Sequence, residues 1–384
     1  MSCTAAVRIA DFCKTGSGGT PSRSQMERYY EGGTIPWIKS GELRESVINH
    51  AAEYVTQAAL KESSIKLVPA GAILLAMYGA TVGRLGILGI EATTNQAICH
   101  IVPDPKLANT RYVFHAISNR VPKLIAMGVG GAQPNISQAI IKDLAIPLPP
   151  LTEQIRIAAI LDQADALRVR RREALAQLDN LTQAIFIEMF GDPADNPKGF
   201  TKKKLGELIK FEGGSQPPAS VFSSEPSPEN IRLIQIRDFK SDRFKTFIPR
   251  RLARRFLEED DVMIGRYGPP VFQILKGLSG SYNVALIKAV PRENLTKKFV
   301  YYLLQEQKLH NFVVANSERT AGQSGVNLEL LEKYMAYLPP LQLQQDFSKR
   351  VDMVDRLKEA SQKSLTELDS LFASLQHRAF RGEL

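Results

Sequence analysis

Residue types that carry out catalysis are present in this chain, but their spacing fits no catalytic site. The histidines are His50, His100, His115, His310 and His377. No two of them lie four residues apart, and none lies at metal-binding spacing from a cysteine. The sequence therefore lacks the pattern of a zinc site, and we expect no metal ion in this chain.

Motifs for cofactor and nucleic-acid chemistry are missing as well. The glycine-rich stretch 16–19 lacks the third glycine of a dinucleotide-binding loop and the lysine of a phosphate-binding loop. None of the diprolines has the flanking residues with which an amino-methyltransferase holds a flipped base. Glu306 and Lys308 have no acidic partner at the spacing of a nuclease site. The sequence predicts a chain that is not itself an enzyme.

The composition is typical of a folded cytoplasmic protein. Of 384 residues, 44% are hydrophobic and 23% are charged, which suits two or three domains. No apolar run is long enough to span a membrane, and the N-terminus does not look like a secretory signal. Cys3, Cys13 and Cys99 are few and irregularly spaced, so we expect reduced thiols.

Charge alternates along the chain. The net formal charge is +4 for residues 1–147, −2 for 148–199, +7 for 200–337 and 0 for 338–384. Basic segments attract polyanions, although an excess of this size is common in cytosolic proteins. The alternation indicates two basic segments, each followed by a segment of another kind.

The chain contains an internal repeat. Leu-Pro-Pro-Leu at 148–151 recurs at 338–341, an offset of 190 residues, and 13 of the 43 positions from 148 onward are identical without a gap. Gln154 falls on Gln344, and Asp162 falls on Asp352. Agreement of this length indicates a duplication.

Each repeated stretch has a helical pattern that begins at its diproline. Apolar residues at steps of three and four predict a coiled-coil seam with a polar middle. The predicted seam runs through Ile157, Ile160, Ala164, Leu167, Arg171, Ala174, Leu178, Leu181 and Ile185, and through Phe347, Arg350, Val354, Leu357, Ser361, Ser364, Leu368, Leu371 and Leu375. Two matching helices in one chain pair most simply as an antiparallel coiled coil. The alternative is two unrelated helices, each packed on its own domain.

The basic segments repeat more loosely. Residues 18–21 align with 214–217, and residues 35–43 align with 231–239. Short apolar runs that end at Tyr-Gly, such as 71–77, indicate strands, and stretches such as 111–117 indicate short helices.

The sequence predicts an α+β fold in which two mixed α/β domains are joined by two long antiparallel coiled-coil helices, with a pseudo-twofold internal repeat. The expected boundaries are 1–147 for the first domain, 148–192 for the central helix, 193–337 for the second domain and 338–384 for the C-terminal helix.

Several of these motifs together resemble a known family. They are Gly18-Gly19-Thr20-Pro21, Ile-Pro-Trp-Ile-Lys at 35–39, Leu-Thr-Glu-Gln-Ile at 151–155, and the closing Phe-Arg-Gly-Glu-Leu at 380–384. The chain resembles the specificity subunit of type I restriction–modification enzymes over its whole length. The second copy departs from the pattern, since Leu343 replaces the equivalent of Glu153 and Arg232-Leu233 replaces Pro36-Trp37.

The resemblance implies a function and a set of partners. Two target recognition domains would each read half of a split sequence in double-stranded DNA, and the helices would act as a spacer. Two methyltransferase subunits and restriction/translocase subunits would dock on the chain. S-adenosylmethionine would then belong to the partner methyltransferase, and ATP and magnesium to the partner restriction subunit, with no cofactor in this chain and no membrane involved.

Candidate DNA-binding residues are polar side chains in or beside predicted loops, because specificity comes from polar contacts at base edges. In the first domain they are Lys39, Ser40, Tyr78, Thr81, Arg84, Asn95, Gln96, Gln133 and Asn135. In the second they are Gln235, Arg237, Lys240, Arg243, Lys245, Arg266, Tyr267, Asn283, Gln323 and Ser324.

Residues that recur in both domains, such as Tyr78 and Tyr267, have a second interpretation as structural residues that support the fold. Domains that read different DNA sequences should differ at the positions that contact the bases. The arginines at 250–255 are expected to form a phosphate-facing or solvated patch, with base reading as the alternative. Those at 168–172 either follow DNA phosphates or stay solvated.

Two other functions are compatible with the sequence. The chain could be the DNA-recognition subunit of a different defence or modification complex. It could instead be a helical adaptor that binds no nucleic acid and uses its globular ends for protein contacts.

Overall fold

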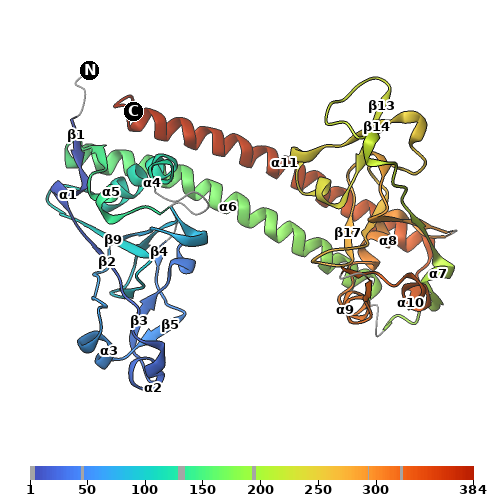
Figure 1. Cartoon of the computed structure of the whole chain (residues 1–384), viewed down its shortest axis with the longest axis horizontal. Helices are drawn as coiled ribbons and strands as arrows, with labels where there is room; N and C mark the ends of the chain where they lie inside the picture. The colour runs from blue at the N-terminus through green and yellow to red at the C-terminus, as the bar shows by residue number, and fades with distance from the viewer. Residues whose placement is uncertain (1–4, 45–46, 129–134, 193–195, 293, 321–322) are drawn as a thin grey trace. The chain divides into compact units, whose positions relative to one another are not determined.

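The computed structural model describes residues 5–44, 47–128, 135–192, 196–292, 294–320 and 323–384. The chain divides into two compact units (Figure 1). Unit 1 comprises Met1–Glu173 and Lys363–Leu384, and unit 2 comprises Ala174–Gln362. Both boundaries fall inside long helices, so each unit contains part of each helix.

The long helices expected after the two diprolines are α6 (Leu151–Phe190) and α11 (Leu341–Ala379). Each starts directly after its diproline, where a proline without an N–H costs no helical hydrogen bond. Gly191 follows α6 with a positive φ of 77°, a conformation that glycine adopts without strain and that ends the helix.

Unit 1 contains a mixed α/β domain. In chain order its elements are β1 (Ala6–Arg8), α1 (Ile9–Phe12), β2 (Cys13–Ser17), α2 (Met26–Tyr29), β3 (Ile35–Ile38), β4 (Val47–Ile48), β5 (Glu53–Val55), α3 (Gln57–Glu62), β6 (Ile73–Ala76), β7 (Leu85–Leu88), β8 (Thr93–Thr94), β9 (Ile98–Pro103), α4 (Thr110–Met127), α5 (Gln138–Lys142) and β10 (Ala145–Pro147). The strands form a sheet ordered β2-β9-β6-β7-β4, a sheet ordered β5-β3-β8, and the pair β1-β10. In Figure 1, β3, β5, α2 and α3 group at one end of the domain, away from α4 and α5.

Unit 2 contains the second mixed α/β domain. Its elements are β11 (Thr201–Lys204), α7 (Leu205–Leu208), β12 (Ile209–Gly213), β13 (Asn230–Ile234), β14 (Phe247–Pro249), β15 (Phe256–Leu257), β16 (Val262–Gly265), β17 (Gln273–Leu275), β18 (Gly280–Tyr282), β19 (Leu286–Pro291), α8 (Lys297–Leu303), α9 (Gln307–Ala315), β20 (Glu318–Thr320), β21 (Gln323–Gly325), α10 (Leu328–Lys333) and β22 (Met335–Leu338). The sheets are ordered β12-β19-β16-β17 and β14-β13-β18-β15, with the pairs β11-β22 and β20-β21.

Several strand pairs of the first domain recur in the second, although the sheets contain different numbers of strands. The antiparallel pair β2·β9 corresponds to β12·β19, and the terminal pair β1·β10 corresponds to β11·β22. The parallel pairing of Trp37 with Thr93 corresponds to that of Leu233 with Ser281. The α+β fold with an internal repeat is therefore confirmed, although the helix expected at 111–117 is longer and extends over Thr110–Met127.

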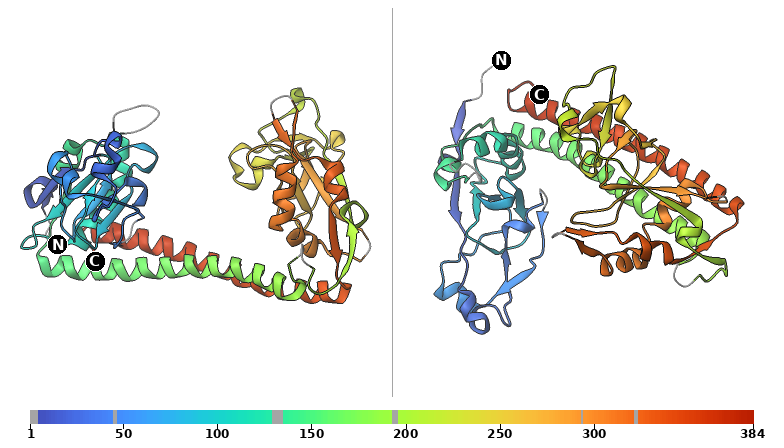
Figure 2. Two further views of the ribbon diagram at one scale, coloured as in Figure 1. Left: turned by 90° about the horizontal axis from the view of Figure 1, so that it is seen from below. Right: turned by 45° about the vertical axis from the view of Figure 1, so that its right-hand side comes forward.

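Within each unit, α6 and α11 run antiparallel and side by side (Figure 2). In unit 1 the guanidinium of Arg168 lies 2.6 Å from Asp369. In unit 2, Lys358 lies 2.8 Å from Asp179, and Phe347 packs edge-on against Phe190. Higher residue numbers on one helix meet lower numbers on the other, as an antiparallel pair requires.

The predicted seam is wrong at two positions of α6 and at three positions of α11. The row of Ile157, Ala164, Arg171, Leu178 and Ile185 is buried or partly buried, as expected. In the second row, the predicted Leu167 and Leu181 are exposed, and the neighbouring Arg168 and Thr182 are partly buried or buried in their place. The predicted Ile160 and Ala174 are partly buried. In α11 the predicted Arg350, Leu357 and Leu371 are exposed, and the neighbouring Val351, Lys358 and Phe372 are buried or partly buried in their place. The other predicted positions of α11 are buried or partly buried.

Polar residues explain the displacement, because they fill seam positions where leucines were expected. Arg168 is 18% exposed, binds Asp165 and Asp369, and stacks on the Phe372 ring at 4.3 Å. Arg168 therefore belongs to the helix interface and is not a solvated or phosphate-tracking residue. The buried Thr182 hydroxyl donates to the Leu178 carbonyl.

A buried glutamine joins each domain to its long helix. The Gln154 side chain is fully buried, and its Oε1 accepts a hydrogen bond of 2.8 Å from the Asn109 N–H. Its Nε2 donates to the carbonyls of Leu107 and Pro149. The amide thus links the start of α6 to the loop that caps α4.

The second copy repeats this link. The fully buried Gln344 accepts from the Thr296 N–H at 2.9 Å and donates to the carbonyls of Asn294 and Pro339. All three partners are backbone groups, so the link does not depend on which side chains surround it. We call these two residues the glutamine links.

An ion pair reinforces the same junction. In unit 1, Asp162 of α6 accepts hydrogen bonds from Arg111 and from the buried His115 of α4. Burial raises the pKa of the Asp162 carboxyl, but the hydrogen bonds from His115 and Arg111 outweigh burial and lower that pKa to about 2. In unit 2, Lys298 of α8 pairs with Asp352 of α11.

The cysteines fit the expectation of free thiols as far as the structure describes them. Cys13 and Cys99 are buried and free, and burial raises the pKa of each thiol to about 12. Cys3 lies outside the described residues. Within the described part of the chain, none of the helices is long and apolar enough to cross a membrane.

The glutamine link predicts a large stability effect from one substitution. Gln154→Ala leaves one N–H and two carbonyls buried without partners, so we expect the free energy of unfolding of unit 1 to fall by about 2–4 kcal/mol. Fluorescence of Trp37, the one tryptophan of the chain, reports this transition in urea. Gln163→Ala, at an exposed site on the same helix, should change the midpoint little. Equal effects of the two substitutions would contradict the role of the link.

Candidate functional site

Backbone hydrogen bonds bring separate loops of unit 1 together. The Asn95 N–H donates to the Ile38 carbonyl at 2.9 Å, and the Met77 N–H donates to the Ala97 carbonyl at 2.8 Å. The Ile136 N–H then donates to the Met77 carbonyl at 2.8 Å. Residues 38–40, 77–78, 95–97 and 135–136 therefore form one surface feature, which we call loop cluster 1.

Unit 2 has the same arrangement. The Asn283 N–H donates to the Ile234 carbonyl at 3.1 Å, the Arg266 N–H to the Ala285 carbonyl at 2.8 Å, and the Val326 N–H to the Arg266 carbonyl at 3.0 Å. We call residues 234–236, 266–267, 283–285 and 325–326 loop cluster 2. The two clusters are built by equivalent bonds between equivalent residues.

The two clusters contain many of the residues predicted from the sequence. Loop cluster 1 includes Lys39, Ser40, Tyr78, Asn95, Gln96 and Asn135, and loop cluster 2 includes Gln235, Arg266, Tyr267 and Asn283. Thr81 and Arg84 lie on the turn between β6 and β7. This turn is joined to Ala76, next to the cluster: the Gly83 N–H donates to the Ala76 carbonyl, and the Ala76 N–H donates to the Arg84 carbonyl. Arg237, Lys240, Arg243 and Lys245 are exposed on the turns that follow β13.

Three predicted residues cannot be placed by their side chains. Gln133 lies outside the described residues. Gln323 and Ser324 have a described backbone in β21, paired with β20, while their side chains lie outside the description. Tyr267 forms an isolated bridge with Gly325, which brings the end of β21 to loop cluster 2.

A carboxylate fixes the first turn of each cluster, and sequence reasoning missed it. Glu42 Oε1 accepts from the Lys39 N–H at 2.9 Å, in the 3-10 turn η2 (Ser40–Glu42). Asp238 Oδ2 accepts from the Gln235 N–H at 2.6 Å, in η5 (Ile236–Phe239). An acidic residue four positions after the end of the strand in both copies was the available signal.

Residues shared by the two clusters serve the backbone frame. The Asn283 side chain is buried, and its Oδ1 accepts from the Ala285 N–H at 3.2 Å within the turn. Asn95 holds the equivalent position, and the N–H of each asparagine makes the bond to β3 or β13. The Asn283 side chain therefore supports its turn, whereas among the described residues the Asn95 Oδ1 has no hydrogen-bond partner.

Side chains at equivalent positions differ between the clusters. The exposed Gln96 of cluster 1 corresponds to Val284 of cluster 2, which is 43% exposed. Lys39 corresponds to Gln235, and Met77 corresponds to Arg266. One frame thus presents two different sets of donors, acceptors and apolar groups.

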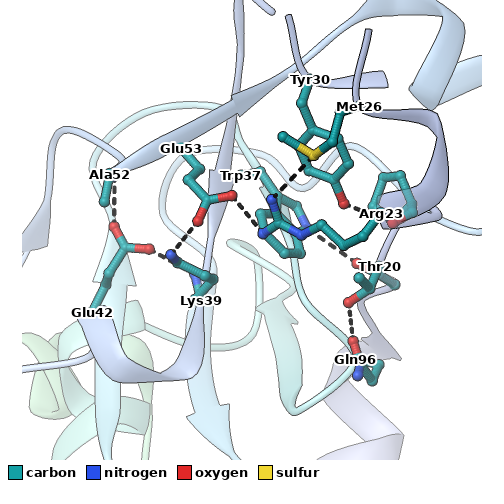
Figure 3. Close-up of polar contacts among 12 residues, drawn as sticks. Thr20, Arg23, Met26, Tyr30, Trp37, Lys39, Glu42, Ala52, Glu53 and Gln96 are labelled. Atoms are coloured by element: carbon teal, nitrogen blue, oxygen red, sulfur yellow. Dashed lines mark hydrogen bonds and ion pairs between the residues drawn. The ribbon is translucent and has the colours of Figure 1, made fainter. Parts of the chain in front are cut away.

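Beside loop cluster 1, one carboxylate holds two cations (Figure 3). Glu53 accepts from Arg23 Nη2 at 2.6 Å and from Lys39 Nζ at 2.5 Å. The hydrogen bond from Lys39 lowers the pKa of the Glu53 carboxyl against the effect of its burial, and Arg23 lowers it further. Arg23, Lys39 and Glu53 together carry one net positive charge on a partly exposed surface.

Aromatic rings fix the position of this group. The Arg23 guanidinium lies 4.3 Å from the centre of the Tyr30 ring and 5.2 Å from that of Trp37. Trp37 Nε1 donates to the Gly19 carbonyl, and the neighbouring Thr20 hydroxyl donates to Gln96 (Figure 3). Thr20, Arg23 and Glu53 are therefore part of the candidate site, and the long sequence distance between them hid this from sequence reasoning.

A different set of contacts lies beside loop cluster 2. Arg232 pairs with the buried Asp238 at 3.3 Å and with Asp242 at 2.9 Å. Gln235 Nε2 and Arg237 Nη2 both donate to the Thr246 hydroxyl. The arginines that follow, at 250, 251, 254 and 255, are exposed.

The two sites present side chains of similar kinds. Each combines exposed amides, hydroxyls and guanidinium groups, which are the groups that bind base edges and phosphates. Among the described residues, no group of three or more histidines, cysteines and carboxylates could hold a metal ion.

Comparison with known proteins places the chain in a family. A model described as the type I restriction modification DNA specificity domain matches residues 4–177 and again residues 197–369. The chain belongs to this family, and it carries two copies of the family domain.

Individual relatives agree with this assignment. A type I restriction enzyme specificity subunit of Escherichia coli is 29% identical over 180 residues, covering 46% of this chain and 44% of that protein. The chain likewise spans 52% of the MjaIX specificity subunit of Methanocaldococcus jannaschii, so it matches about half the length of these two relatives. The EcoKI specificity subunit of E. coli strain K12 is 22% identical over 96% of this chain and 86% of its own length.

Solved structures share the fold. The type I S subunit from M. genitalium superposes with a TM-score of 0.59 at 16% identity, covering 98% of this chain and 96% of that one. A chain from a type I R-M system has a TM-score of 0.59 at 20% identity, covering 100% and 98% of the two chains.

Proposed function

We propose that this chain is the sequence-specific DNA-binding specificity subunit of a type I restriction–modification complex, and that it reads a bipartite target in double-stranded DNA. The observation that carries the proposal is the pair of loop clusters, in which one backbone frame presents different exposed side chains. Two readers of different sequences need a common support and different contacts. The repeat provides the common support, and residues such as Gln96 and Val284 provide the different contacts.

The side chains suit the edges of base pairs. An amide such as that of Gln96 can pair with adenine, and an arginine such as Arg266 can pair with guanine. Arginines and lysines around each cluster supply the phosphate contacts that give most of the affinity. We retain all of the residues predicted from the sequence as candidate DNA contacts, and we add Thr20, Arg23 and Glu53.

The chain acts without catalysis of its own in this proposal. S-adenosylmethionine binds to the partner methyltransferase, and ATP and magnesium bind to the partner restriction subunit, while this chain supplies recognition. Because its substrate is chromosomal and invading DNA, we place it in the cytoplasm.

Methylation sequencing tests the function directly. Cells that lack other DNA methylases would receive this chain together with its methyltransferase, or the methyltransferase alone. We expect methylation at a split motif, two specific half-sites around a gap of unspecified bases, in cells with both proteins only. Methylation at the same sites without this chain, or none with it, would refute the proposal.

The long helices supply the proposed docking surfaces for two methyltransferase subunits. Leu167 and its repeat equivalent Leu357 are 50% and 55% exposed, and Leu181 and Leu371 are 44% and 50% exposed. These leucines occupy the row that the seam leaves uncovered. Exposed leucines at equivalent positions of a duplication favour two equivalent protein contacts.

The docking proposal predicts a change in subunit number. Leu167→Asp and Leu357→Asp each place a charge in one of the two surfaces, so each should remove one methyltransferase from the complex. Native mass spectrometry should then give one methyltransferase per chain instead of two. Ala166→Asp is the control, because an adjacent residue on a helix is turned by about 100° from Leu167. Two bound subunits in both leucine variants would contradict the proposed surfaces.

A further inference from the structure

Phe244 is an exposed aromatic side chain on the surface of unit 2 that lies outside the hydrophobic core. It ends the short 3-10 turn η6 (Asp242–Phe244), and 56% of it is exposed. Within the described residues, it belongs to neither of the apolar clusters of unit 2. Single exposed apolar side chains are common on protein surfaces, so the ring indicates a partner only together with the charged groups around it.

The turn that carries Phe244 is held firmly. The Ser241 hydroxyl accepts from the Arg243 N–H at 3.1 Å and caps the turn. The Asp242 carboxylate binds Arg232 at 2.9 Å and Lys245 at 3.0 Å. Arg232 in turn binds Asp238, which fixes the first turn of loop cluster 2. The ring is thus connected to the candidate site through a chain of ion pairs.

Cations surround the ring. The guanidinium carbon of Arg243 lies 5.1 Å from the ring centre, and that of Arg237 lies 5.8 Å from it. Arg237 is also held by its bond to Thr246, and Lys240 and Lys245 are exposed nearby in sequence. An apolar ring amid positive charge suits a partner that combines an apolar group with a negative surface.

Duplex DNA has that combination in its major groove. Phosphates border the groove, and the thymine methyl is the apolar group that the base pairs present there. We propose that Phe244 is a specificity-determining residue that contacts the methyl group of a thymine in the second half-site, while Arg237 and Arg243 contact the DNA beside it. This inference rests on the proposed function and adds a base and a residue to it.

Binding to methyl-free DNA tests the contact. The assembled complex of this chain with its methyltransferase would be titrated with its target duplex, with fluorescence anisotropy as the readout at fixed salt. Each thymine of the second half-site would be replaced in turn by deoxyuridine, which lacks the methyl group. At one position we expect the wild-type Kd to rise about three- to tenfold.

The variant Phe244→Ala should bind the unmodified duplex more weakly by a similar factor and should be insensitive to deoxyuridine at that position. Val314→Ala, which truncates an exposed apolar residue on α9, should behave as the wild type. Thermal unfolding of each variant separates a loss of binding from a loss of folding.

Three results would overturn the inference. In the first, Phe244→Ala binds every duplex as tightly as the wild type. In the second, the substitution weakens the binding of all duplexes equally, whether or not they carry thymine methyl groups. In the third, the second half-site contains no thymine. An equal loss would point to a ring that packs on the sugar–phosphate backbone or wedges between bases. Failure of the proposed function gives a different result, in which the wild-type complex does not distinguish its target from a scrambled duplex.

Discussion

The glutamine links are the interaction on which the rest of the molecule depends. A side chain with one acceptor and two donors is completely satisfied by three backbone groups at each junction. Because the partners are backbone groups, the surrounding side chains can change without loss of the link. Each domain is therefore attached in the same way to its helix, and the ion pairs of Asp162 and Asp352 add to this attachment.

A fixed attachment allows recognition surfaces to diverge. The hydrogen bonds that join Ile38 to Asn95 and Ile234 to Asn283 build the same frame in both domains, although side chains such as Gln96 and Val284 differ between them. Unit 1 places an arginine between aromatic rings and a carboxylate, whereas unit 2 places an exposed phenylalanine between arginines. A shared backbone geometry with different side chains is the arrangement that the proposed reading of two different half-sites requires.

Sequence reasoning predicted the parts of the structure that depend on local pattern. The diprolines located both long helices, and the ungapped repeat aligned Gln154 with Gln344, although nothing in the sequence indicated that they form the links. The helix seam was displaced by one residue because Arg168 and Thr182 are buried by ion pairing and hydrogen bonding that hydrophobic periodicity does not register. Glu53 and Thr20 were missed because their partners, Arg23 and Gln96, are distant in sequence. Contacts of that kind are visible only in the folded chain.

The central claim is that each domain reads its own half-site by means of its own loop cluster. A chimera tests it, in which residues 201–337 are replaced by a second copy of residues 5–147 and both long helices are kept. Methylation sequencing with the partner methyltransferase would identify the modified motif. We expect the modified motif of the chimera to contain two copies of the first half-site in inverted orientation, because the long helices pair antiparallel. An active chimera that still modified the original second half-site would show that the second domain does not read that half-site.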